Sequence, residues 1–433
     1  MIASFALLAP FASPAPPAPA DPPLEVVTDA SELGQAEREL LGALFAVEPL
    51  LPPETGGETP EAWEAAAAAL GRAAERAAAA GSPALGAYLE IAGGALLSGE
   101  VGELEAAWMA AGSEPFVVIL GPAGAGGDGE PPIHHLEIGI PDGAEHRWVD
   151  PLLERMADFE RWLPLEAEHR SGPENLRASI VVANAVLRGG SLAGSSGPGQ
   201  YLPFDRGLRE SLGRRDVFWK NLAAEAWYAN EVRFVAERSL VEGQRELATA
   251  GAHLRFYATR FAMYQLGPQG VWTEAGRVSL REHFGESWGP LQVLKADVLA
   301  ILAHEWLIEQ GLQPAETSGE NLAMAITMAF LGAAEELEAH RRAGLVALGT
   351  LARRGAMRLD PSGTWAFEPE RVRAVLRELA AEVFAIHASG DRERAEALLA
   401  RYARPAKAID GTLRKLTERP PWRVPVEYVV RGL

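Results

Sequence analysis

The sequence contains no cysteine and only four lysines, and its charge is strongly one-sided. Without cysteine there is no disulfide, zinc ribbon, iron–sulfur cluster, thiol nucleophile or lipid-modified N-terminal cysteine. Histidine and carboxylate side chains therefore remain as metal ligands. The 59 acidic residues outnumber the 40 basic ones, and the formal net charge of -19 opposes binding to a phosphate backbone. We expect no nucleic-acid partner.

The sequence also lacks an apolar run of the roughly 20 residues that a membrane-spanning helix needs. Residues 2–12, IASFALLAPFA, form a shorter apolar run, and a tract rich in proline and alanine follows it. We interpret residues 1–27 as a leader and tether, which predicts export to a periplasmic or extracellular location. Met1 is not followed by the Lys or Arg of a typical export signal, so a cytoplasmic protein with a flexible terminus is the alternative.

Apolar residues make up 48% of the 433 residues, which is enough for a large core. The chain contains two kinds of segment, helical and strand-like. Helical periodicity covers most of residues 29–111 and almost all of the chain from Asp216 onward. β-Branched runs of strand length, bounded by Gly and Pro, cover residues 114–122, 133–141 and 178–187. The final segment, RVPVEYVV, alternates in polarity and is expected to rejoin this small sheet.

The order of these helical and strand-like segments predicts a mainly helical α+β fold with two lobes. Residues 28–215 are expected to form an N-terminal mixed α/β lobe that holds the small sheet. Residues 216–417 are expected to form a helical lobe, and residues 418–433 to return as a strand to the first lobe. The sequence shows no internal repeat of fixed period.

Three segments together resemble a known family. The C-terminal segment reads LRELAAEVFAIHASGDRERAEALLARYA and then TLRKLTERPPWRVPVEYV; the segment from Lys295 reads KADV before LAILAHEWLIEQG; and the segment from Gly199 reads GQYLPFDRGLRE, with Asn184 upstream. In this order they resemble the dipeptidyl peptidase III family of zinc peptidases, specifically its shorter bacterial and plant-type members, some of which are fused to nudix domains. The resemblance covers about residues 30–433. It implies a two-lobed metallopeptidase-like fold whose interlobe cleft binds an extended peptide along a strand edge.

The resemblance also indicates where the family's zinc chemistry would lie. Family members bind zinc through H-E-x-x-H and a glutamate of an E-E-x-K-A-D segment. The matching positions here are Arg260, Phe261 and Tyr264, and then Gln292 and Val293. Without the three ligands and the general base, no bound metal would lower the pKa of an attacking water. Arg260 is permanently charged and would repel a dication, so we expect no metal and no cofactor.

Other residues of the family motifs are retained. Lys295 and Asp297 match the K-A-D part of the segment, and His340 matches a family histidine that is thought to hydrogen-bond in the transition state. For His340, a surface position between Glu338 and Arg341 is the alternative.

We interpret the chain as a catalytically degenerate relative that binds a peptide, a small polar ligand or a partner protein in the interlobe cleft. Two alternatives stay open. One is an active hydrolase with unrecognised metal ligands, and the other is a structural or interaction protein whose own side chains fill the cleft.

Further candidate sites carry weaker signals. His304 begins a string similar to H-E-x-x-H, but Ile308 stands where the second histidine is needed, so we expect a solvated or capping histidine. His135 and Glu137 share one face of a predicted strand, and we interpret that face as exposed. The remaining features are interpreted as ordinary structure: flexible loops at 121–130 and 188–200, and an aromatic stripe over 219–264 that is mainly core.

Overall fold

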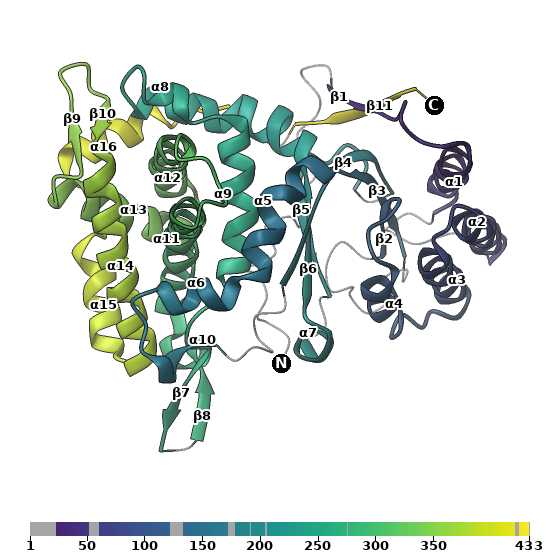
Figure 1. Ribbon diagram of the computed structural model, residues 1–433, viewed down its shortest axis with the longest axis horizontal. Coiled ribbons are helices and arrows are strands. Elements are labelled where there is room, and N and C mark those ends of the chain that lie inside the picture. The colour runs from purple at the N-terminus through teal and green to yellow at the C-terminus, as the bar shows by residue number, and fades with distance from the viewer. Residues whose placement is uncertain are drawn as a thin grey trace. The chain divides into compact units, whose positions relative to one another are not determined.

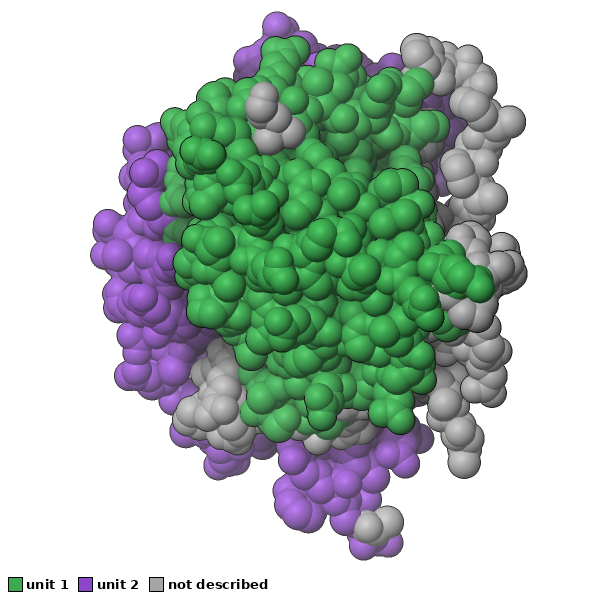
Figure 2. Space-filling model, turned by 90° about the vertical axis from the view of Figure 1, so that its right-hand side faces the viewer, with its two compact units in different colours: residues 1–146, 179–227, 422–433 green, residues 147–178, 228–421 purple. Residues whose placement is uncertain are grey.

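The computed structural model describes residues 23–51, 60–121, 133–171, 178–190, 192–203, 206–274, 276–420 and 424–432. Most of the predicted leader and of the loop at 121–130 lies outside these ranges. The chain divides into two compact units, coloured separately in Figure 2. Unit 1 comprises residues 1–146, 179–227 and 422–433, and unit 2 comprises residues 147–178 and 228–421. The predicted boundaries differ, since they place residues 147–178 with the N-terminal segment.

Unit 1 is built on a five-stranded sheet with the strand order β2-β3-β4-β6-β5. Its strands are β2 (Val117–Gly121), β3 (His135–Pro141), β4 (Ala178–Gly190), β5 (Gly199–Leu202) and β6 (Arg214–Trp219). The helices that accompany it are α1 (Gln35–Phe45), α2 (Pro60–Ala79), α3 (Pro83–Ser98), α4 (Leu104–Ala111) and α7 (Arg206–Leu212), with a 3-10 turn at Glu48–Leu50.

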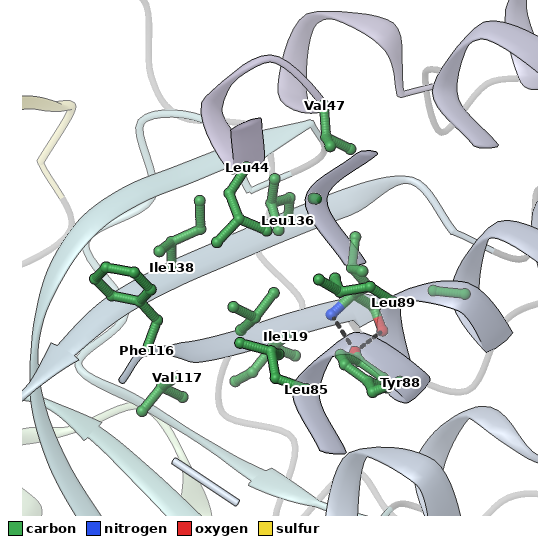
Figure 3. Packing of buried hydrophobic residues seen from close by; sticks show 14 of the residues in the cluster. Leu44, Val47, Leu85, Tyr88, Leu89, Phe116, Val117, Ile119, Leu136 and Ile138 are labelled. Atoms are coloured by element: carbon green, nitrogen blue, oxygen red, sulfur yellow. Dashed lines mark hydrogen bonds between the residues drawn. The ribbon is translucent and has the colours of Figure 1, made fainter. Parts of the chain in front are cut away.

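Helices α1 to α4 pack beside β2 and β3 (Figure 1). Leu44 of α1 and Leu89 of α3 lie over Leu136 and Ile138 of β3 in one apolar cluster (Figure 3). The alanine-rich α2 approaches α3 closely at Gly86. A Cβ at that position would lie 3.0 Å from the Ala74 carbonyl oxygen, so a side chain there would push the two helices apart.

The C-terminal strand does not join the five-stranded sheet, and that prediction is wrong. Strand β11 (Val426–Arg431) pairs in parallel with β1 (Leu24–Asp29), and the two form a separate sheet within unit 1. The first strand therefore begins inside the range interpreted as a tether. The Thr28 hydroxyl links β1 to β4 by donating to the Ala185 carbonyl oxygen at 2.9 Å, and Asn221 donates to Thr28 at 3.0 Å.

Unit 2 is mainly helical, as predicted for this part of the chain. Its helices are the greater part of α5 (Gly143–Glu154), whose first residues belong to unit 1, and α6 (Met156–Trp162), α8 (Arg233–Ser239), α9 (Ala250–Met263), α10 (Leu280–Phe284), α11 (Trp288–Glu309), α12 (Thr317–Ala334), α13 (Glu338–Arg353), α14 (Pro369–Ser389), α15 (Arg392–Arg401) and α16 (Lys407–Lys415). Two hairpins are added by β7 (Gly270–Thr273) with β8 (Gly276–Ser279) and by β9 (Met357–Leu359) with β10 (Trp365–Phe367). Short 3-10 helices lie at Ala167–His169, Arg245–Leu247 and Gly285–Ser287.

The helical segment that was predicted to begin at Asp216 begins later in the chain. Residues 216–219 belong to β6, and a π-helix at Leu222–Val232 follows. Short apolar runs such as Val217 to Trp219 fit a buried strand and a buried helix equally well, so periodicity cannot separate the two. Within the described residues, none of the helices combines the length and apolarity that a bilayer crossing demands.

The sheet of unit 1 encloses a polar cluster that the sequence interpretation placed on an exposed face. Glu137 of β3 is fully buried and forms an ion pair with Arg188 of β4 at 2.5 Å. The Trp219 indole donates to the same carboxylate at 3.1 Å, and the Gln200 amide donates to its other oxygen. Arg188 also donates to the Gly197 carbonyl oxygen at 2.8 Å. These buried interactions link strands β3, β4, β5 and β6.

Replacing Glu137 by alanine is expected to lower the free energy of unfolding by about 3–5 kcal/mol, because Arg188 would stay buried without its partner. Urea denaturation followed by circular dichroism measures the change. Glu39→Ala is the matched control, since Glu39 pairs with Arg76 on the exposed surface and such pairs contribute less than about 1 kcal/mol. Equal losses in the two variants would refute the structural role of the buried pair.

Candidate functional site

Two helices of unit 2 carry the positions matched to the family's zinc motifs. Helix α9 begins at Thr249, whose hydroxyl accepts the Ala252 backbone N–H at 3.1 Å, and it is buried from Phe256 to its end. Helix α11 is buried along almost its whole length. A helix that is apolar on all sides runs through the middle of a core. Polar side chains on these two helices therefore need partners inside the unit.

Arg260 of α9 and Asp297 of α11 are such partners. The Arg260 Nε lies 2.5 Å from the Asp297 Oδ1, and the two side chains are 11% and 27% exposed. The pair shows that the two predicted motif segments face each other. Burial raises the pKa of Asp297, and the Arg260 charge opposes that rise. Burial works against the charge on Arg260, but the attractions of Asp297, Tyr264, Tyr257 and Glu335 together outweigh it and hold the pKa of Arg260 above its ordinary value.

A second pair lies within electrostatic reach of the first. His340 of α13 contacts Glu335, which follows the last residue of α12, with 2.7 Å between Nδ1 and Oε2. Burial would raise the pKa of Glu335, but the hydrogen bond from His340 and the charges of His340 and Arg260 hold it below its ordinary value. We call Arg260, Asp297, Glu335 and His340 the Arg260 cluster. His340 thus belongs to this cluster, and its side chain is 20% exposed, whereas the alternative interpretation placed it at the surface between Glu338 and Arg341.

The aromatic residues of α9 line up beside the cluster. Phe261 makes edge contacts with Tyr257 at 5.1 Å and with Tyr264 at 6.2 Å between ring centroids. Phe261 and Tyr257 are buried, which agrees with the prediction that this stripe is mainly core. Tyr264 is partly exposed and follows the last residue of α9.

The other predicted site residues do not join the cluster. Lys295 points to the end of α9 and donates to the carbonyl oxygens of Leu266 at 2.8 Å and Tyr264 at 3.1 Å. Gln292 and Val293 are buried in α11, and the Gln292 Oε1 has no hydrogen-bond partner among the described residues. Of the eight predicted residues, Arg260 pairs with Asp297, His340 pairs with Glu335, and Phe261 contacts Tyr264.

The arrangement does not fit a zinc ion. A guanidinium donates hydrogen bonds and cannot coordinate a cation, and the carboxylate that faces it is already committed to it. No group of three or more His, Cys, Asp and Glu side chains with metal-binding geometry occurs in the part of the chain that the structure describes. The residues matched to the zinc motif therefore offer a charged, hydrogen-bonding site rather than a coordination site.

His304 differs from its prediction as a solvated or capping residue. Its ring is fully buried in α11 and hydrogen-bonds the Thr259 hydroxyl at 3.0 Å and Gln313. Burial lowers the pKa of His304 to about 4, so the ring is neutral in ordinary buffers. It joins α9 to α11 as a core residue.

Two residues of unit 2 escaped the sequence interpretation. Glu335 lies in the acidic stretch AAEELEAH, a pattern that is typical of a solvated helix face. The break between α12 and α13 instead directs its side chain toward the interior of the unit. Glu160 of α6 is buried and accepts the Gly267 backbone N–H at 2.8 Å beside the Lys295 site. It lies over 100 residues from that site in the sequence, and no local pattern connects them.

Lys295 predicts an unusual dependence of stability on pH. Burial lowers its pKa from the ordinary 10.5 to about 7, and the Glu160 charge offsets this only in part. Between these values the unfolded chain binds a proton that the folded chain has lost, so the free energy of unfolding rises as the pH rises from 7 toward 10. Relative to Lys295→Met, the wild type should gain roughly 2 kcal/mol between pH 7 and 9, measured by urea denaturation. Parallel pH profiles of the two proteins would contradict this assignment.

The chain has a mainly helical α+β fold with a small mixed sheet. In this fold the chain is similar to solved dipeptidyl peptidase III structures. It matches the one from Caldithrix abyssi with a TM-score of 0.76 at 24% identity, over 85% of this chain and 70% of that one. It matches the one from Corallococcus sp. strain EGB with a TM-score of 0.67 at 24% identity, over 83% and 68%.

The sequence comparisons are sparser. No family model matches the chain. Nudix hydrolase 3 of Arabidopsis thaliana is 24% identical over an alignment of 347 residues, which covers 78% of this chain and 43% of that protein. The chain therefore spans less than half the length of this curated relative. The two solved structures confirm the predicted mainly helical fold of the dipeptidyl peptidase III type, and the two-lobe arrangement stays a prediction.

Proposed function

We propose that this protein is a catalytically degenerate relative of dipeptidyl peptidase III that binds a peptide or a small polar ligand at the Arg260 cluster. The observation that carries the proposal is the ion pair of Arg260 with Asp297 at the positions matched to the zinc motif. A guanidinium supplies a fixed positive charge where active relatives would hold a dication. It activates no water, because it has no open coordination position and no proton to lose near pH 7.

The charges of the cluster favour a ligand with an ammonium group. Two carboxylates, those of Asp297 and Glu335, face the single permanent positive charge of Arg260, and His340 adds a second positive charge only when its ring is protonated. The carboxylate side chains are also more exposed than the guanidinium, at 27% and 25% against 11%. A peptide amino terminus or a small amine therefore meets acceptors at the surface of the cluster, and Tyr264 adds a partly exposed aromatic ring beside them.

Binding is tested with the tetrapeptide Ala-Ala-Ala-Ala and its N-acetylated form, titrated by isothermal calorimetry. The free peptide should bind at least about tenfold more tightly than the acetylated one, since a charge-assisted hydrogen bond contributes roughly 1.5–3 kcal/mol. Glu335→Gln should remove most of this difference. Glu338→Gln, which alters a neighbouring exposed carboxylate, is the matched control and should leave it unchanged. Equal binding of the two peptides would refute the proposed ligand class.

A parallel assay separates the alternatives. The wild-type protein is incubated with a dipeptidyl-naphthylamide with and without added zinc, and naphthylamine release is measured. We expect no release above the buffer rate under either condition. Turnover that scales with protein and is abolished by a chelator would instead establish an active hydrolase. Absence of both turnover and peptide binding would favour a structural or interaction protein with a filled site.

A further inference from the structure

Unit 1 contains a cavity that is separate from the Arg260 cluster. Its volume is about 440 Å³, within the range of small-molecule sites. The walls come from α3, α4, β2, β3, β5 and α7, all in unit 1. Val101 and Gly102, in the exposed turn between α3 and α4, lie at its rim. Solvent therefore has a route to the cavity through this turn.

Most of the cavity wall is apolar. Tyr88 and Trp108 contribute aromatic surface, and their polar atoms are already committed to β2. The Tyr88 hydroxyl accepts the Leu120 backbone N–H at 2.8 Å (dashed in Figure 3), and the Trp108 indole donates to the Val118 carbonyl oxygen at 2.8 Å. Aliphatic side chains such as Ile119 complete the wall. The wall thus suits an apolar ligand.

One polar side chain in the wall is without a hydrogen bond. His135 of β3 is 1% exposed, and neither of its ring nitrogens has a hydrogen-bond partner among the described residues. A buried polar group without a partner costs roughly 1–3 kcal/mol. Burial, together with the neighbouring His134 and Arg188, holds the pKa of His135 well below its ordinary value, so the ring is neutral. A neutral imidazole offers one donor and one acceptor.

We propose that this cavity binds a small, uncharged and mainly apolar molecule whose single hydroxyl or N–H group hydrogen-bonds the His135 ring. The ligand supplies the hydrogen bond that none of the described residues gives to His135, and the aromatic walls enclose its apolar body. An anion is disfavoured, because Glu105 lines the same cavity and the neutral ring supplies no positive charge. The site is independent of the function proposed for unit 2.

The polar contact is tested with indole and indene, which have the same shape but differ in one N–H group. Both are used to displace the uncharged fluorescent probe N-phenyl-1-naphthylamine from the full-length protein. The wild type should bind the probe saturably and should prefer indole over indene about tenfold, the equivalent of one hydrogen bond. His135→Leu should still bind the probe but lose the preference. His134→Leu, at an equally buried neighbour outside the cavity wall, is the matched control and should keep it.

The route of entry is tested separately at the exposed rim, where substitutions disturb folding least. Val101→Trp should weaken probe binding at least tenfold by obstructing the cavity, whereas Leu97→Trp, at an exposed position outside the wall, should not. Circular dichroism verifies that the variants are folded. Lack of saturable probe binding to the wild type, or the same indole preference in His135→Leu as in the wild type, would overturn the proposal.

Discussion

Replacing Asp297 by alanine is expected to lower the free energy of unfolding by about 3 kcal/mol or more. The substitution leaves the Arg260 guanidinium in the core of unit 2 without the carboxylate that faces it at 2.5 Å. Breaking a buried ion pair by removing one partner typically costs about 3–5 kcal/mol, and the partial exposure of Asp297 places the loss at the lower end. Urea denaturation at pH 7 measures the change.

Two controls separate this cause from general disturbance. Arg260→Met combined with Asp297→Leu removes both charges, and it should recover most of the loss because no unpaired charge remains. Asp410→Ala breaks an exposed pair with Arg414 on α16 and should cost less than about 1 kcal/mol. A loss of similar size in the double variant would mean that packing, and not charge pairing, determines the effect at Asp297.

Restoring the zinc ligands is expected to create metal affinity where the wild type has none. The variant combines Arg260→His, Phe261→Glu, Tyr264→His and Val293→Glu. A histidine in the last turn of α9, a second histidine four residues later at the residue that follows α9, and a glutamate of α11 then form a three-ligand site, since the Arg260–Asp297 contact shows that the two segments meet. Competition with a chromophoric chelator should yield a zinc dissociation constant of about 1 μM or lower, the equivalent of roughly 8 kcal/mol.

The control for this experiment omits the glutamate and keeps Val293, so that two ligands and the general base remain. It should bind zinc at least about tenfold more weakly than the four-fold variant, because a ligand is missing. If the variant with all four substitutions is folded and binds no zinc, then the positions matched to the family motif are displaced from the true ones.

The overall fold was largely predictable from the sequence, for specific physical reasons. Long periodic segments such as α11 and α14 signal helices by their length, and β-branched runs bounded by Gly and Pro signal β2, β3 and β4. Which strands pair with each other was harder to predict from the sequence. The pairing of β11 with β1 joins two chain ends about 400 residues apart, and alternation alone does not state which strand a segment meets.

The candidate site was predictable where family motifs fixed the register, and less so elsewhere. Arg260 and Asp297 followed from matched positions on two helices, and their contact needed the structure. Glu335 escaped because an acidic residue near a helix end reads as solvated. His135 and Glu137 were placed on the exposed face because alternation shows which residues share a face but not whether that face is covered.

We propose that an arginine–aspartate pair takes the place of a catalytic metal in this protein. The most direct test is the zinc content of the purified wild-type protein after equilibration with zinc and dialysis, measured by inductively coupled plasma mass spectrometry. We predict far less than one zinc per chain, unchanged in Asp297→Asn and His340→Ala. One tightly bound zinc per chain that is lost in either variant would contradict the account.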